Sequence, residues 1–372
     1  MIKTPKSSLV NILLDNVGLY EKNQQDALAL ELDGLFLEIK GGEFMALVGP
    51  SSSEQTDILR IIAGLKEPAS GRVLFNGQTL QRFSPDYKNI AMVFQSQALY
   101  PHLNVRKNLE FGLKLADLPR DTINARIAET ASLIGISDIL NSSIKQISKP
   151  QRQLVAIARA FVKRPQVLLF DNPISELDPQ LKVRMQSVIK RFCLNSQVTV
   201  IYATHNPSEA MTLGDRIAYI EEGKVQQIGT SYELYNNPVS EDVARFISYP
   251  EMNFLEFETE VDGDRYTMNL INADFSIHAP RFYEKFAKVY QRAKIGIRAE
   301  NLKIVSERPN AIPMVVEMQE FFGSSSILYV SRESQSLSVE IPLNEHYEIG
   351  ETVYVELEIG GLHFFANGKF IV

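Results

Sequence analysis

A short apolar run, Phe44-Met45-Ala46-Leu47-Val48, is followed at once by Gly49-Pro50-Ser51-Ser52-Ser53-Glu54-Gln55-Thr56-Asp57. The apolar run predicts a buried strand, and residues 57–63 have the spacing of a helix. A glycine-led loop between a strand and a helix is the setting of a phosphate-binding loop, whose pattern is G-x-x-x-x-G-K-[S/T]. Gly49 and Thr56 match that pattern, whereas Glu54 and Gln55 replace its second glycine and its lysine. The loop alone predicts a strand–loop–helix unit and leaves its function open.

The rest of the chain extends this unit into an α/β domain followed by a β domain. Apolar runs at 167–170 and 198–203 predict two more buried strands, and helices are predicted over 151–163 and after Asp121, which can cap one. Strands joined through helices indicate a mainly parallel sheet. After about residue 237 the pattern changes to short, often alternating segments typical of a small all-β domain. These segments are 254–261, 265–271, 313–318, 326–331, 336–341 and 352–359.

The composition excludes several classes of protein. The 372 residues predict about two domains, and the single cysteine, Cys193, excludes a disulfide framework and a Cys-rich zinc site. Basic and acidic residues number 27 and 26 in residues 1–249, and 11 and 19 in residues 250–372, so neither part has a nucleic-acid binder's basic excess. No apolar run approaches the roughly 20 residues of a membrane span. We expect a cytoplasmic protein without a nucleic-acid partner, and Cys193, in an apolar stretch, is expected in the core.

Several further segments carry motifs of one family. They are 93–102 (VFQSQALYPH), 167–173 (VLLFDNP), 175–179 (SELDP), 202–205 (YATH), 249–255 (YPEMNFL) and 295–300 (IGIRAE). The first four resemble the Q-loop, Walker B strand, D-loop and switch-histidine loop of the ATP-binding-cassette (ABC) family. The last two resemble the C-terminal β domain found in ATPase subunits of sugar importers. The chain therefore resembles those subunits over almost its whole length.

This resemblance implies a P-loop NTPase ABC cassette in residues 1–240, with a mainly parallel sheet and a helical, signature-bearing subdomain at about 90–160. It implies an all-β, OB-like domain of the TOBE type in residues 241–372. ATP and Mg²⁺ are the implied cofactors. The implied partners are membrane permease subunits and a second cassette, in a homo- or heterodimer. Such a subunit is expected to lie peripherally at the inner face of the cell membrane.

The resemblance also assigns residues to roles. The matching catalytic positions are Gln95, Asn172 and His205. The positions that match cofactor-binding residues are Tyr20, Gly49, Ser51, Ser52, Ser53, Glu54, Gln55, Thr56, Asp57 and Asp171, and the implied Mg²⁺ ligands are Thr56, Gln95 and Asp171. The signature and D-loop positions are Ser148, Lys149, Pro150, Gln151 and Asp178.

The phosphate-facing positions depart from the family's pattern. Gln55 offers neutral donors where the family's lysine places a charge, and charge-assisted hydrogen bonds are roughly twice as strong as neutral ones. Glu54 places a carboxylate where a glycine lets the backbone approach phosphate. A like-charge pair about 4 Å apart costs at most about 4 kcal/mol at an effective dielectric constant of about 20. Asp57 adds a second negative charge at the start of the helix. These changes predict impaired binding of ATP and Mg²⁺.

The catalytic and signature positions depart as well. Asn172 stands where the family has a catalytic glutamate, so general-base help, worth about 10²–10⁴ in rate, is lost. Residues 147–151 (ISKPQ) replace the family's LSGGQ signature, and Pro150 has no backbone N–H to donate. Simpler roles also fit: Glu54, Asp57 and Lys149 as solvated loop charges, Asn172 as a turn residue and Tyr20 as a packing residue.

The pairing of cassettes decides what these losses mean. In this family two cassettes pair head to tail, and each ATP site combines the phosphate loop of one chain with the signature loop of the other. Since both segments are altered, neither site would be complete even with an intact partner. The sequence predicts an importer subunit, for carbohydrate by resemblance, that is impaired or inactive in ATP binding and hydrolysis. It would act as the structural or regulatory partner of an active cassette and dock on a permease through residues 95–108. An active ATPase with an unusual site and a soluble regulatory protein stay open as alternatives.

Overall fold

The computed structural model describes residues 9–22, 28–79, 89–116, 118–262, 265–271, 275–278, 283, 290, 292–309, 311–333 and 335–371. Their contacts form two compact units, Met1–Ser231 and Tyr232–Val372. The boundary of the predicted domains, at residue 240, falls inside the second unit. Along the described parts of the chain no helix is long and apolar enough to cross a membrane.

The first unit contains a six-stranded sheet in the order β10–β9–β3–β8–β7–β6. Its strands are β3 (Phe44–Val48), β6 (Ile90–Val93), β7 (Val167–Asp171), β8 (Thr199–Ala203), β9 (Arg216–Glu221) and β10 (Lys224–Gly229). All pair in parallel except β10, which is antiparallel to β9. Every residue of β3, β7 and β8 is buried, as expected for parallel strands covered on both faces. The predicted mainly parallel sheet is confirmed.

A second, antiparallel sheet in this unit has the order β2–β1–β4–β5. Its strands are β1 (Ile12–Lys22), β2 (Leu28–Ile39), β4 (Ser70–Phe75) and β5 (Gln78–Thr79). Apolar side chains of β1, β2 and β4 share one core with β3 and with the helix that follows it. The strand and the helix on either side of the loop are therefore packed into a core that both sheets share.

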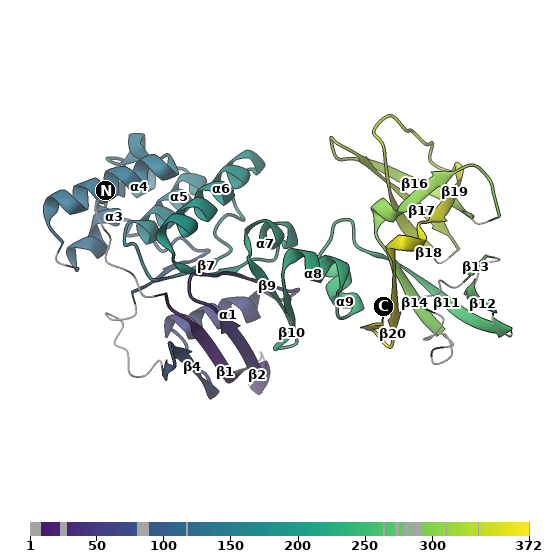
Figure 1. Cartoon of the computed structure of the whole chain (residues 1–372). Helices are drawn as coiled ribbons and strands as arrows, with labels where there is room; N and C mark the ends of the chain where they lie inside the picture. The colour runs from purple at the N-terminus through teal and green to yellow at the C-terminus, as the bar shows by residue number, and fades with distance from the viewer. Residues whose placement is uncertain are drawn as a thin grey trace. The chain divides into compact units, whose positions relative to one another are not determined.

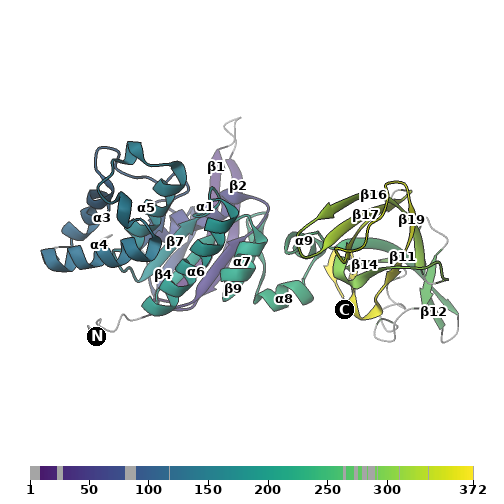
Figure 2. The same cartoon turned by 90° about the horizontal axis from the view of Figure 1, so that it is seen from above.

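Helices complete the first unit. They are α1 (Ser52–Ala63), α3 (Val105–Lys114), α4 (Arg120–Ile134), α5 (Lys149–Phe161), α6 (Pro179–Ser196) and α7 (Pro207–Leu213). The helices α3, α4 and α5 lie together in both Figure 1 and Figure 2, and their apolar faces join one core with α6. The predicted capping of a helix by Asp121 is wrong, because α4 has Pro119 as its N-cap and Asp121 in its first turn. Cys193 is buried in this core, as predicted.

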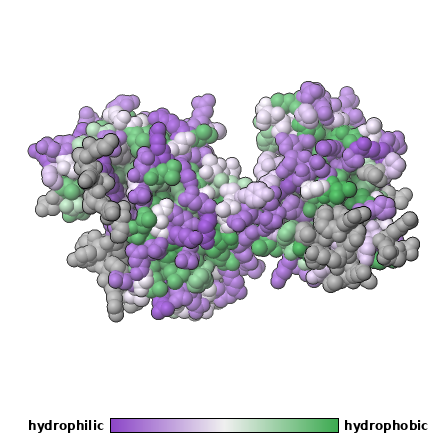
Figure 3. Space-filling view, viewed as in Figure 1, coloured by the Kyte–Doolittle hydropathy of each residue, from purple (hydrophilic) through white to green (hydrophobic). Residues whose placement is uncertain are grey.

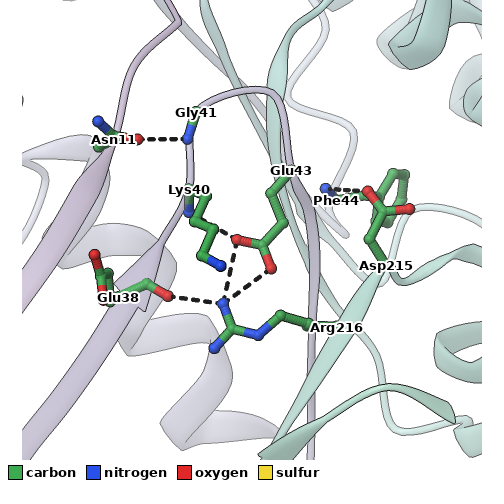
Figure 4. Close-up of polar contacts among 8 residues, drawn as sticks. All are labelled: Asn11, Glu38, Lys40, Gly41, Glu43, Phe44, Asp215 and Arg216. Atoms are coloured by element: carbon green, nitrogen blue, oxygen red, sulfur yellow. Dashed lines mark hydrogen bonds and ion pairs between the residues drawn. The ribbon is translucent and has the colours of Figure 1, made fainter. Parts of the chain in front are cut away.

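Polar contacts fix the start of β3, at the end opposite its glycine loop (Figure 4). The carboxylate of Glu43 accepts from the backbone N–H of Lys40 at 2.7 Å and from Arg216 at 3.1 Å. The backbone N–H of Phe44 donates to Asp215 at 2.9 Å. These bonds tie the start of β3 to the start of β9.

The second unit is built from two antiparallel sheets, in the orders β13–β12–β11–β14–β20–β21 and β15–β19–β16–β17–β18. The first holds β11 (Asn253–Asp262), β12 (Arg265–Leu270), β13 (Ser276–His278), β14 (Arg292–Ile297), β20 (Leu362–Ala366) and β21 (Lys369–Phe370). The second holds β15 (Leu302–Val305), β16 (Ala311–Phe321), β17 (Ser326–Arg332), β18 (Gln335–Ile341) and β19 (Thr352–Leu357). Both sheets contribute to one apolar core, so this unit is the predicted β domain.

Two short helices, α8 (Ser231–Asn236) and α9 (Glu241–Phe246), precede these strands. The buried guanidinium of Arg298 donates to the backbone oxygens of Tyr235 and Ala244 at 2.8 and 2.9 Å. His363 Nε2 lies 3.0 Å from the backbone oxygen of Asn236. These contacts explain why the second unit begins before residue 240. On the viewed face of each unit, apolar residues form small groups between polar ones (Figure 3).

Candidate functional site: the phosphate-loop pocket

The loop after β3 is crowded at Gly49. A Cβ atom there would lie 1.9 Å from the backbone oxygen of Ile220 and 2.7 Å from Gln55 Nε2. Only glycine therefore fits at the end of β3. The side chain of Gln55 lies over Gly49 and is 2% exposed, and its Nε2 has no hydrogen-bond partner among the described residues. The amide of Gln55 thus occupies the interior of the loop.

Glu54 is buried and bonded within the protein. Its side chain is 8% exposed, and Oε1 accepts from the backbone N–H of Gly223 at 2.9 Å. The buried Oε2 has no hydrogen-bond partner in the described structure. Burial raises the pKa of Glu54, and the bond from Gly223 offsets part of that rise. The interpretation of Glu54 as a solvated loop charge is therefore wrong.

Asp57 is also buried, at 3% exposure, so a solvated role is wrong for it too. Its carboxylate pairs with Lys66 at 2.7 Å and with Arg60 at 3.4 Å. The added negative charge that the sequence predicts at this position is therefore offset by two cations. At the start of α1 the hydroxyls of Ser51 and Ser53 lie 2.8 Å apart, and the side chain of Ser52 is outside the described structure.

Thr56 and Asp171 meet across the pocket. The Thr56 hydroxyl donates to Asp171 Oδ1 at 2.8 Å, and burial raises the pKa of Asp171 although the Thr56 bond lowers it. A hydroxyl beside a carboxylate is a donor set that suits Mg²⁺. Gln95, the third predicted ligand, lines the same pocket. No cluster of three or more His, Cys, Asp or Glu with metal-site geometry occurs in the described part of the chain.

The pocket around these residues measures about 630 Å³. It is lined by Ser53, Thr56, Asp57, Arg60, Phe94, Gln95, Ser96, Gln97, Lys149, Asp171 and Glu176. Both cations in this lining are paired with carboxylates, because Arg60 contacts Asp57 at 3.4 Å and Lys149 contacts Glu176 at 2.8 Å. The lining therefore offers no unpaired positive charge to a phosphate, and it fits Mg²⁺ better than it fits a polyphosphate.

The segment in the signature position is a helix N-terminus. The Ser148 hydroxyl accepts from the backbone N–H of Gln151 at 3.3 Å, and Gln151 Oε1 accepts from the backbone N–H of Ser148 at 2.9 Å. This capping box begins α5, with Lys149 and Pro150 as its first two residues. Lys149 is exposed, in agreement with its interpretation as a solvated charge, although it is ion-paired. Asp178 caps α6 through a 3.0 Å bond from Leu181 N.

Asn172 and His205 lie next to each other beyond Asp171. Asn172 is buried with φ 45°, and its Oδ1 lies 3.0 Å from His205 Nδ1. In a neutral imidazole this contact requires the proton on Nδ1, since an amide oxygen only accepts. The backbone N–H and the hydroxyl of Ser175 both donate to the backbone carbonyl of Asn172. Asn172 is therefore a turn residue as well as a hydrogen-bond partner of His205.

Two contacts near the pocket were not predicted from the sequence. Buried Glu209 accepts from the hydroxyls of Tyr202 and Thr204, each at 3.0 Å, and so braces the loop that carries His205. Lys66 lies nine residues beyond Asp57, and α1 ends between them. Helical spacing therefore could not predict this ion pair.

Tyr20 is 52% exposed, so its interpretation as a packing residue is wrong, and it does not line the pocket.

Comparison with known proteins decides the family. The model of the ABC transporter family matches residues 32–175, and that of the TOBE domain matches residues 295–365. The chain is 37% identical to the trehalose/maltose import ATP-binding protein MalK of Thermococcus litoralis, over 90% of this chain and 94% of that protein. The chain belongs to the ABC transporter family. The predicted ABC cassette and TOBE-type β domain are thus confirmed.

Other relatives of this ABC protein agree. It is 34% identical to the sn-glycerol-3-phosphate import ATP-binding protein UgpC of Escherichia coli, over 89% of this chain and 92% of that protein. A solved dimeric bacterial ABC transporter cassette matches with a TM-score of 0.55 and 28% identity, over 59% of this chain and 98% of that one. The same values hold for that cassette in a post-hydrolysis state bound to ADP and Pi. The first unit of the present chain is therefore an ABC cassette.

Proposed function

We propose that this chain is the cassette subunit of an importer for carbohydrate and that it is impaired or inactive in ATP binding and hydrolysis. It pairs with an active cassette and supports the complex from the inner face of the membrane. The names of its relatives, which import trehalose/maltose and sn-glycerol-3-phosphate, support the class of cargo.

The observation that carries the proposal is the chemistry of the pocket. Gln55 is neutral, and each cation of the lining is paired with a carboxylate, so a polyphosphate gains little charge stabilisation. Asn172, which faces His205, is an amide and cannot act as a general base at neutral pH. Thr56 and Asp171 still form the oxygen pair that would hold Mg²⁺. Mg²⁺, when bound, would screen phosphate charge.

A groove on the same unit supports docking on a permease. It measures about 480 Å³ and combines the exposed side chains of Leu65, Phe111 and Leu115 with the cations Arg159 and Lys163. Burial lowers the pKa of both cations, so each gains from an opposite charge. An amphipathic permease helix with an acidic residue fits this lining. Ala98 and Tyr100, which also line the groove, belong to the predicted docking segment, residues 95–108, and this supports the proposal.

Affinity purification at native expression levels in mild detergent tests the proposal. The wild-type chain is expected to recover a permease and a second cassette. Leu115→Asp is expected to lose both or the permease alone, because it removes an apolar contact and adds a carboxylate that competes with the partner's acidic residue for the cations of the groove. Val183→Asp, an exposed apolar position on α6 outside the groove lining, is the matched control and is expected to keep them. Recovery of no membrane component by the wild type contradicts the proposal.

A further inference from the structure

Three elements of the cassette meet at Gly223. The turn between β9 and β10 has φ 51° at Glu222 and φ 72° at Gly223, the left-handed pair of a two-residue hairpin turn. The carbonyl of Gly223 accepts from Asp33 N of β2 at 3.0 Å, and its N–H donates to Glu54 of α1 at 2.9 Å. Both backbone groups of Gly223 are therefore used, one toward β2 and one toward the phosphate loop.

The turn is held against β2 without Glu54. A Cβ atom on Gly223 would lie 2.8 Å from the backbone oxygen of Glu31 and 3.0 Å from Asp33 N, so turn and strand are in close contact. Lys224 adds an ion pair with Asp33 at 2.8 Å. Because the turn is already anchored, the bond from Gly223 to Glu54 fixes α1 and its loop to that anchor. A glycine at position 54 could not make this bond.

The first turn of α1 covers the glycine of the fixed loop. Glu54 directs its carboxylate to Gly223, and the next residue, Gln55, places its buried amide over Gly49. Oε2 of Glu54 and Nε2 of Gln55 are both buried without hydrogen-bond partners among the described residues. Unpaired buried groups are unfavourable, so packing and the Gly223 bond hold this arrangement in place.

We propose that Glu54 is an autoinhibitory latch that fastens the phosphate loop to the β9–β10 turn and keeps it closed against nucleotide phosphates. The inference rests on the proposed function, since it assumes that the loop descends from a nucleotide site. The Glu54 carboxylate excludes nucleotide by holding the loop in place. Electrostatic repulsion of phosphate is a smaller effect, because the carboxylate points toward the β9–β10 turn. Glutamine at position 54 keeps an oxygen that can accept the hydrogen bond from Gly223 N but carries no charge. Glycine removes both the acceptor oxygen and the charge.

Equilibrium titration with a fluorescent ATP analogue and Mg²⁺ separates these effects. The variants are Gln55→Lys, Glu54→Gly with Gln55→Lys, and Glu54→Gln with Gln55→Lys. The latch predicts that the glycine double variant binds at least about tenfold more tightly than Gln55→Lys, the order expected for one bond to a charged group. It predicts that the glutamine double variant stays within about threefold of Gln55→Lys. Equal tightening by glutamine and glycine, or no tightening by glycine, overturns the latch.

Hydrogen exchange of the purified chain gives an independent readout. The Gly223 amide is expected to exchange at least about tenfold faster in Glu54→Ala than in the wild type and to stay protected in Glu54→Gln. The Asp33 amide, which bonds to the Gly223 carbonyl, reports that the turn is still folded. Unchanged exchange at Gly223 in Glu54→Ala with Asp33 protected overturns the latch. Both experiments use the chain alone, so they can fail while permease recovery succeeds.

Discussion

Replacing Glu54 by glutamine should stabilise the cassette at neutral pH and lose that advantage in acid. The glutamine carbonyl keeps the bond from Gly223, and the replacement removes a buried charge whose Oε2 is unpaired. An unsatisfied buried polar atom costs about 1–3 kcal/mol, and more when charged. The glutamine NH₂ takes the place of Oε2 and is also unpaired, so part of that penalty remains. We expect a net gain on the order of 1 kcal/mol at pH 7.

The sign of the pH dependence follows from the pKa of Glu54. Burial raises that pKa, and the negative charges of Glu31 on β2, Glu221 at the end of β9 and Glu222 in the turn raise it further. A raised pKa means that the folded wild type favours the protonated acid. Its stability is therefore greatest below the ordinary glutamate pKa and falls as the pH rises through the folded value. The advantage of Glu54→Gln should grow from about pH 4 to about pH 7.

Urea-dependent hydrogen exchange of buried β3 and β8 amides measures this unfolding free energy without interference from the second unit. Glu67→Gln, at an exposed position, is the matched control and should change the free energy by less than about 0.5 kcal/mol at each pH. A Glu54→Gln advantage that is constant with pH, or that shrinks as the pH rises, would refute the reasoning.

Three further predictions concern other buried groups. Arg298→Ala should destabilise the second unit by about 3–5 kcal/mol in calorimetry, since it strips partners from buried carbonyls, whereas exposed Arg292→Ala should change it by under about 1 kcal/mol. Gly49→Ala should lower the first unit's melting temperature because its Cβ would overlap a carbonyl, whereas Gly360→Ala, with open space around it, should leave the second unit nearly unchanged. Burial raises the pKa of Cys193 to about 12, so iodoacetamide at pH 8 should label it only after urea unfolding, and rapid labelling of the native chain would contradict this.

The fold was predictable where the sequence pattern is simple. The continuous apolar runs at 44–48 and 167–170 gave buried strands that match β3 and β7 within one residue. The antiparallel sheet of β1, β2, β4 and β5 was not predicted. Its pairing of β1 with β2 contains register shifts, and Asn16 has φ 54°, so the alternation of polar and apolar residues that marks a strand is interrupted.

The site was predictable in position but not in side-chain direction. The strand–loop–helix order located Glu54 and Asp57 at the start of α1. Their partners could not be inferred from local pattern, because Gly223 is 169 residues from Glu54 and Lys66 lies beyond the end of the helix that holds Asp57. These contacts turn two charges that were expected to be solvated into a buried hydrogen bond at Glu54 and two ion pairs at Asp57. The sequence therefore shows which residues of the family's pattern are absent at this site. It does not show the contacts that the substituted residues make.

Steady-state release of phosphate by the purified chain with ATP and Mg²⁺ is the most direct test of the proposed catalytic impairment. The account predicts a rate no higher than that of the matched Asp171→Ala variant, because both cations that line the pocket are paired with carboxylates. Gln55 is neutral, and Asn172, next to His205, cannot act as a general base. Phosphate release by the wild type that the Asp171→Ala substitution abolishes would contradict the account. It would favour an active ATPase with an unusual site.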